Sequence, residues 1–202
     1  MMRGRVLTVI VAGFLIGALA GAAALILTRG PAGPGVATTG TALIGGPFTL
    51  VGEDGKPVTD QAFRGKYMLV FFGFTHCPDI CPAELQVMSA ALDELGPKAN
   101  EIIPMFITLD PERDTPRVVA DYVKNFGQRF VGLTGSPEQV AEAAKAYRMT
   151  YSKFQEEGAK PDDYTIDHSA LVFLMGKDGE YLTHFAYGTP AAKMAETLRR
   201  YL

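Results

Sequence analysis

The chain has 202 residues, of which 48% are hydrophobic and 20% are charged, a balance typical of a globular protein of about one domain and not of a disordered or collagen-like chain. The net charge is −3, and the part of the chain after residue 52 is more acidic, with 16 basic and 22 acidic side chains. Proteins that bind nucleic acids are ordinarily basic, so this composition excludes that class. The two cysteines are too few for a disulfide-stapled scaffold or a four-cysteine zinc site.

The N-terminal region contains a long apolar run. Residues 6–27 include no charged side chain, and a run of this length can cross a bilayer as a helix. Arg3 and Arg5 precede it, and only Arg29 lies close behind it. The excess of positive charge on the first side predicts a cytoplasmic stub at residues 1–5 and the rest of the chain outside the cytoplasm.

A cleaved signal peptide is the alternative, since Ala18-Leu19-Ala20 resembles a cleavage site. The apolar run continues beyond that site, which favours an uncleaved transmembrane anchor. Residues 28–47 follow as a linker rich in Gly and Pro, and residues 48–202 form the folded domain. We expect a single-pass protein of the bacterial inner membrane, with this C-terminal domain in the periplasm.

The domain alternates between strand and helix patterns. Residues 67–74 and 102–109 are continuous apolar runs, as expected for strands buried on both faces of a sheet. Residues 170–175 and 181–185 flank a Gly-Lys-Asp-Gly turn and predict a hairpin. A smaller hairpin is predicted within residues 48–59.

Four helices are expected to begin where a capping residue precedes a proline. The four pairs are Thr115-Pro116, Ser136-Pro137, Thr189-Pro190 and Cys81-Pro82. Ser136 with Gln139 also fits a capping box, and the last pair puts Cys81 in the N-cap position. The order of elements predicts an α/β, thioredoxin-like fold, with a mainly parallel central sheet that ends in a β-hairpin and a helix.

Both cysteines lie where an α/β sheet usually carries its chemistry. Cys77 and Cys81 follow the first buried strand and precede the first helix. Unpaired N–H groups at a helix N-terminus favour a thiolate, which is both the nucleophile and the metal-binding form of cysteine. The spacing of the two residues allows a dithiol chelate, a redox-active disulfide or a purely structural disulfide.

Three motifs together resemble the Sco/SenC family, the copper-handling assembly factors of cytochrome c oxidase. They are Gly73-Phe74-Thr75-His76-Cys77-Pro78-Asp79-Ile80-Cys81-Pro82, Asp110-Pro111-Glu112-Arg113-Asp114-Thr115-Pro116 and Asp167-His168-Ser169. The resemblance covers essentially the whole domain. It implies a thioredoxin fold with one copper ion, copper(I) or copper(II), held by Cys77, Cys81 and His168.

The donor set implied by the resemblance suits that metal. Two thiolates and an imidazole favour copper(I) and can also hold copper(II). The Cys-x-x-Cys spacing of a thioredoxin-like reductase is absent. Residues 164–168 are expected to form the loop that lies against the cysteines, with an imidazole in place of the proline that thioredoxins carry there.

Other polar residues near the motifs have less specific interpretations. His184 is expected at the surface of the hairpin, and His76 as a neighbour of the thiolate without a ligand role. Asp79, Asp110 and Asp167 are candidates for orienting the ligands. For the first two, a location near a helix start or in a turn before a proline is the alternative explanation.

Two functions from different classes follow. The first is a copper metallochaperone that delivers the ion to the CuA site of cytochrome c oxidase subunit II, with a periplasmic copper donor and a thioredoxin-like reductant as further partners. The second is a thiol–disulfide oxidoreductase, in which the redox-active pair Cys77 and Cys81 reduces the CuA-site cysteines or other periplasmic disulfides. His168 separates the two functions, because a chelate needs it and a dithiol reductant does not.

Overall fold

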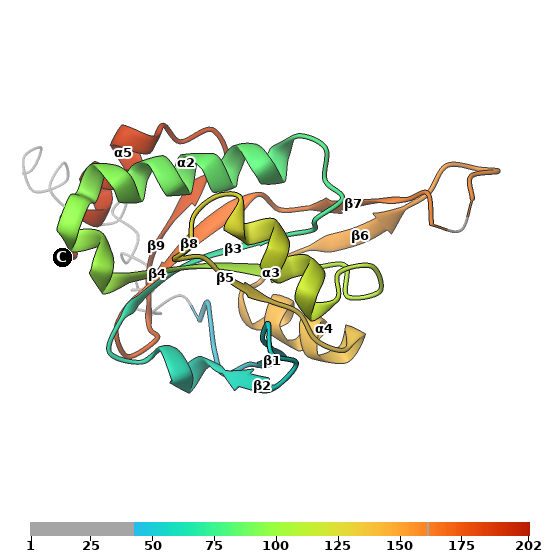
Figure 1. The fold of residues 1–202 in the computed structure, drawn as a ribbon, viewed down its shortest axis with the longest axis horizontal. Helices are drawn as coiled ribbons and strands as arrows, with labels where there is room; N and C mark the ends of the chain where they lie inside the picture. The colour runs from blue at the N-terminus through green and yellow to red at the C-terminus, as the bar shows by residue number, and fades with distance from the viewer. Residues whose placement is uncertain (1–42, 161) are drawn as a thin grey trace, which may run out of the picture. The chain divides into compact units, whose positions relative to one another are not determined.

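The computed structural model describes residues 43–160 and 162–202. A five-stranded sheet in the order β5-β4-β3-β8-β9 forms the centre of the fold (Figure 1). Its strands are β3 (Tyr67–Gly73), β4 (Ile102–Thr108), β5 (Val131–Leu133), β8 (Leu171–Met175) and β9 (Tyr181–Ala186). The first three are parallel, whereas β8 and β9 pair antiparallel. The predicted α/β order with its terminal hairpin is therefore confirmed, and the predicted mainly parallel sheet is parallel from β3 to β5 only.

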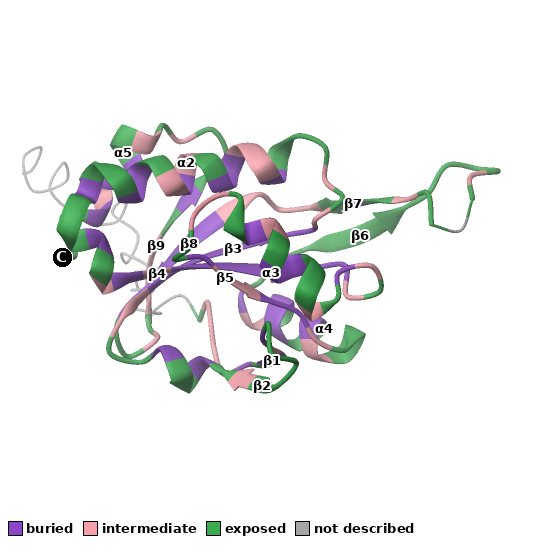
Figure 2. Cartoon of the chain, in the orientation of Figure 1, coloured by how far each residue is buried: buried purple, intermediate pink, exposed green. Residues whose placement is uncertain are grey.

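The helices cover both faces of this sheet. α2 (Ile80–Leu95) packs against α5 (Ala191–Leu198) on one face, and α4 (Pro137–Ala146) lies on the other, beside the small hairpin of β1 (Thr49–Val51) and β2 (Pro57–Thr59) (Figure 1). α3 (Pro116–Lys124) packs against the edge strand β5. Two short 3-10 helices, η1 (Asp60–Phe63) and η2 (Gly96–Glu101), precede β3 and β4. Figure 2 shows that β3 and β4, at the centre of the sheet, are largely buried.

Two of the four predicted helix caps are confirmed. The hydroxyl groups of Thr115 and Ser136 accept the N–H groups of Val118 and Gln139, and Ser136 completes the predicted capping box. The cap predicted at Thr189 is wrong, because Pro190 occupies the N-cap of α5 while the Thr189 hydroxyl donates to an earlier carbonyl.

The cap predicted at Cys81 is also wrong. α2 begins two residues earlier than predicted, at Ile80, with Asp79 as the N-cap. Proline is tolerated throughout the first helical turn, where the N–H groups have no partner within the helix. A residue followed by proline therefore locates a helix start only to within a residue or two.

The expected loop at residues 164–168 is instead mostly strand. β7 (Thr165–His168) pairs antiparallel with β6 (Tyr151–Phe154), and Tyr151 lies opposite His168. Figure 1 shows this pair as an arm that projects beyond the central sheet, and Figure 2 shows that most of it is exposed. The periodicity of apolar residues does not reveal β6, because all four of its residues are exposed.

The predicted anchor at residues 6–27 lies outside the described residues. Within the described ranges, no helix is both long and apolar enough to cross a membrane. Leu43 and Gly45, which the sequence placed in the linker, already hydrogen-bond to Arg148 and Ala146 next to α4.

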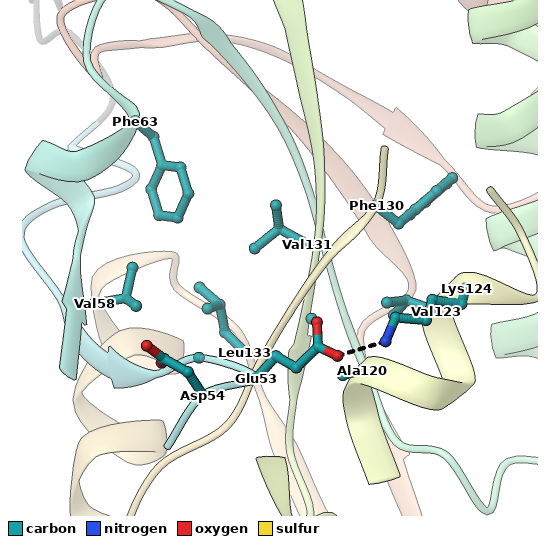
Figure 3. Close-up of a pocket in the computed structure, with 12 residues that line it drawn as sticks. Glu53, Asp54, Val58, Phe63, Ala120, Val123, Lys124, Phe130, Val131 and Leu133 are labelled. Carbon is teal, nitrogen blue, oxygen red and sulfur yellow. Dashed lines mark hydrogen bonds and ion pairs between the residues drawn. The ribbon is translucent and has the colours of Figure 1, made fainter. Parts of the chain in front are cut away.

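A hollow of about 410 Å³ lies between the β1–β2 turn, α3 and β5. Figure 3 shows apolar side chains on its walls and the Glu53–Lys124 ion pair at its rim. None of the cysteines or histidines lines it. The chemistry predicted from the sequence therefore lies elsewhere, at the carboxyl end of β3.

Candidate metal centre

The start of α2 brings the two cysteines together. Cys81 is the second residue of the helix and is fully buried, whereas Cys77 lies in the preceding loop and is partly exposed. The backbone N–H of Cys81 donates to Sγ of Cys77 over 3.3 Å, and the N–H of Asp79 points to the same sulfur. The Cys77 sulfur thus takes the place of a capping oxygen at the helix N-terminus. Both cysteines are free thiols.

This arrangement shifts the pKa values of the two cysteines in opposite directions. The hydrogen bond from the Cys81 thiol, helped by the two backbone amides, lowers the pKa of Cys77 to about 5. The same hydrogen bond, together with burial, raises the pKa of Cys81 far above its ordinary value. At neutral pH, Cys77 is therefore the thiolate and Cys81 the neutral thiol that stabilises it.

Gly73, the last residue of β3, leaves the space that Cys81 occupies. A Cβ atom at this position would lie 2.7 Å from Sγ of Cys81 and 2.9 Å from the ring of Phe106. Both contacts are shorter than side chains tolerate, so only glycine lets the buried sulfur pack directly against the strand.

His168 completes the cluster from the end of β7. Its Nε2 atom lies 3.6 Å from Sγ of Cys81, and its Nδ1 atom lies 3.1 Å from the carbonyl oxygen of Ser169. A carbonyl only accepts hydrogen bonds, so Nδ1 carries the proton and Nε2 presents its lone pair to the Cys81 sulfur. The edges of the ring contact Phe71 and Phe74, which restricts its orientation.

The structure therefore places Cys81 next to each of the other two predicted ligands, Cys77 and His168. Two sulfurs, one of them ionised, and one unprotonated imidazole nitrogen are soft and borderline donors of the kind that copper(I) prefers. The fixed Nδ1–H and the amides around Cys77 hold these donors in orientations that suit binding of a metal.

The other predicted polar residues occupy different surroundings. Asp79 is exposed, and its side chain makes no capping hydrogen bond. Asp167 is exposed on β7, opposite Ser152. His184 stacks on Tyr181 at the exposed surface of β9, as the sequence predicted.

Asp110 has a clear structural role. It is buried and accepts hydrogen bonds from Nε of Arg113 (2.5 Å) and from the hydroxyl of Tyr164 (2.7 Å). It therefore joins the loop after β4 to the chain just before β7, and contributes no donor to the cysteine cluster.

A second group, formed by His76, Asp110 and Asp114, has potential ligand atoms within 4.8 Å of one another. The carboxylate oxygens in it are already engaged. Asp114 accepts from the backbone and hydroxyl of Thr75, and Arg113 places a positive charge against Asp110. The group is therefore better described as a hydrogen-bonded network than as a metal site.

Three residues that matter for the geometry were missed from the sequence. They are Gly73, Asp114 and Tyr164. Gly73 and Asp114 lie inside the quoted motifs, which pointed to these positions but did not indicate what the residues do. Tyr164 lies outside the motifs, and only the fold brings it to Asp110.

Comparison with known proteins agrees with this description. The family model for SCO1/SenC matches residues 36–202. The human mitochondrial SCO1 homolog is 42% identical over 168 residues, which cover 80% of this chain and 55% of that protein. The chain thus spans about half the length of that curated relative.

Solved structures of two further proteins superpose closely. Arabidopsis thaliana ScoI with copper bound has a TM-score of 0.73 and 40% identity, covering 78% of this chain and 97% of that one. Bradyrhizobium japonicum ScoI with copper bound has a TM-score of 0.71 and 42% identity, covering 79% and 99%. The match of the family model over most of the chain, with these relatives, shows that the protein belongs to the SCO1/SenC family.

Proposed function

We propose that this protein is a copper chaperone that holds one copper ion between Sγ of Cys77, Sγ of Cys81 and Nε2 of His168. The observation that carries the proposal is the 3.6 Å approach of Nε2 to the Cys81 sulfur, with the other ring nitrogen committed to a backbone carbonyl. The copper bound in the two ScoI structures supports the choice of metal.

The two sulfurs have different tasks in this proposal. Cys77 is partly exposed and already ionised at neutral pH, so it can accept the ion first. Cys81 is buried and protonated, so it must lose its proton when it becomes a ligand. Copper uptake near neutral pH should therefore release about one proton per ion.

We propose that the receiving site is the CuA centre of cytochrome c oxidase subunit II, as the resemblance to the family implies. Transfer would proceed by ligand exchange, in which a cysteine of the acceptor replaces Cys77 on the ion. No covalent bond of the acceptor is broken, and the copper need not change its oxidation state. Delivery of copper to this acceptor is a separate claim from copper binding, and a separate experiment tests it.

Cells that carry only a His168→Ala variant provide that test. The change removes one ligand and leaves both sulfurs and the start of α2 intact. If delivery of copper is the main task, these cells should lack CuA and oxidase activity, like cells without the gene. Normal oxidase activity at low copper would contradict delivery through this site.

Thiol–disulfide exchange is the second candidate, favoured by the unequal protonation of the two cysteines. The Cys77 thiolate would attack a partner disulfide and release one partner thiolate. Cys81 would then displace the second one, leaving a Cys77–Cys81 disulfide and a partner dithiol. This step needs no imidazole, so the oxidoreductase alternative predicts that His168→Ala retains activity.

We further propose that residues 6–27 anchor the protein in the bacterial inner membrane with the domain in the periplasm. The apolar run and the arginines before it support this topology. The full-length protein should stay with membranes after an alkaline carbonate wash, and protease should reach the domain only from the periplasmic side. A mature N-terminus at Gly21 would contradict the anchor and identify a cleaved signal peptide.

A further inference from the structure

The loop after β4 contacts both sides of the candidate metal centre. We call this segment, residues 110–116, the bridging loop. It closes on itself through the N–H groups of Arg113 and Asp114, which donate to the carbonyl of Asp110 over 3.2 Å and 2.9 Å. Of the three acidic side chains in the loop, those of Asp110 and Asp114 are buried and that of Glu112 is exposed.

On one side, the bridging loop holds the cysteine loop. Asp114 accepts the N–H of Thr75 over 3.0 Å and the hydroxyl of Thr75 over 2.5 Å. Thr75 precedes Cys77 by two residues. The buried carboxylate thus fixes the backbone from which the first sulfur projects.

On the other side, the same loop holds the strand that ends in His168. The Tyr164 hydroxyl donates to Asp110 over 2.7 Å, and Nη1 of Arg113 donates to the carbonyls of Asp162 and Tyr164. The guanidinium of Arg113 also lies 3.6 Å from the centre of the Tyr164 ring. Tyr164 is therefore held by its ring, its hydroxyl and its carbonyl, just before β7.

Thr108 connects the two sides. Its hydroxyl donates to Asp114 over 2.6 Å and accepts the N–H of Asp110 over 2.9 Å. A continuous chain of hydrogen bonds thus runs from Thr75 through the bridging loop to Tyr164. Such networks resist distortion because each buried group has a partner that would be lost.

We infer that the bridging loop sets the position of His168 relative to Cys77 and Cys81, with Asp110, Arg113 and Tyr164 as positioning residues for the imidazole. This inference rests on the proposed copper site. None of these side chains is a ligand. They act through His168, whose strand β7 also pairs with β6 along its whole length, and Ser169 bonds to Thr150 just beyond that pairing.

Tyr164→Phe is the sharpest probe, because it removes only the hydroxyl and keeps the ring beside Arg113. Full-length reduced protein would be titrated with copper(II) against a competing chelator, and the sulfur-to-copper charge-transfer band recorded. We expect a weakening of about tenfold or more, as is usual when a group that orients a ligand is lost, with a shifted band. Arg113→Lys, which keeps the charge but loses the planar fork, should act in the same direction.

Tyr67→Phe is the matched control. Its hydroxyl donates to the carbonyl of Tyr201, at the opposite end of β3 from the cysteines, so its loss should leave copper binding unchanged. In a His168→Ala background, Tyr164→Phe should change copper affinity by less than about twofold, because a positioning residue has no effect without its ligand.

The outcomes separate this inference from the proposed function. A folded Tyr164→Phe protein with the wild-type band and affinity would overturn the inference. An equal effect of Tyr164→Phe with and without His168 would also overturn it, because that would indicate general loosening of the fold. Failure of the unmodified protein to bind copper would refute the copper site itself.

Discussion

The sulfur of Cys77 accepts the backbone N–H of Cys81 over 3.3 Å. The positive end of α2 therefore stabilises the first cysteine of the pair, although the second one belongs to the helix. This relationship gives one sulfur that is ionised and accessible and one that is buried and protonated. Binding, transfer and disulfide exchange all start from that asymmetry.

Alkylation of the reduced protein should show this asymmetry directly. Since the pKa of Cys77 is lowered to about 5, the thiolate fraction, and with it the rate of alkylation at Cys77, should rise through pH 5 and level off well below pH 7. Cys81 should not react across that range. Peptide mapping after a short pulse of iodoacetamide gives both rates.

Cys81→Ala provides the control for that experiment, because it removes the thiol that donates to Cys77. The midpoint for Cys77 should then move up towards the ordinary value for a cysteine. An unchanged midpoint would mean that the backbone amides alone stabilise the thiolate.

Gly73→Ala should damage the site through packing. The new methyl group would meet the Cys81 sulfur and the Phe106 ring, and overpacking of this kind costs about 1–3 kcal/mol of unfolding free energy. Copper binding should weaken as well, because the sulfur must shift. Gly46→Ala is the matched control, since its nearest neighbour would be Ala146 at an ordinary 3.5 Å. Urea unfolding and a copper titration of both variants test this, and equal stabilities would contradict it.

Glu84 should oppose stability at neutral pH. Glu84 is buried in α2, and its Oε1 atom has no hydrogen-bond partner among the described residues. Burial raises the pKa of this carboxyl group to about 6, although a hydrogen bond from the backbone of Gly188 lowers it in part. The folded state then binds its proton more tightly than the unfolded state, for which the ordinary value is 4.5. The contribution of this group therefore favours folding below pH 4.5, and that benefit is lost as the pH rises through about 6.

Glu84→Gln should consequently be more stable than the unmodified protein at pH 7, by about 1–2 kcal/mol, and this difference should shrink as the pH falls from 6 to 4.5. Glu94→Gln, on the exposed side of the same helix, should show no such trend. Urea unfolding at several pH values measures the difference. A constant gap across the range would contradict the assignment.

The sequence predicted the central sheet well and singled out the candidate ligands, because both depend on strong local signals. Buried strands such as β3 are continuous apolar runs, and the resemblance identified Cys77, Cys81 and His168 by their motifs. The structure places Cys81 beside both Cys77 and His168. The family comparison confirms the resemblance itself.

What the sequence did not reveal depends on contacts between distant segments. The arm of β6 and β7 is largely exposed, so it lacks the apolar alternation that marks a half-buried strand. The bond between Tyr164 and Asp110 joins residues 54 positions apart. The role of Gly73 arises from a sulfur eight residues later along the chain, and no local pattern encodes that approach.

Copper binding by the reduced full-length protein decides whether the two cysteines are ligands. We expect about one copper per chain and a visible band from sulfur to copper(II), because the proposed site supplies two sulfur ligands. Cys77→Ser and Cys81→Ser should each abolish the band, as should prior oxidation to the disulfide. His168→Ala should hold copper(II) weakly while copper(I) still binds through the two sulfurs. Equal binding by the oxidised protein, or an unaltered band in the serine variants, would show that the sulfurs are not ligands and would contradict the account.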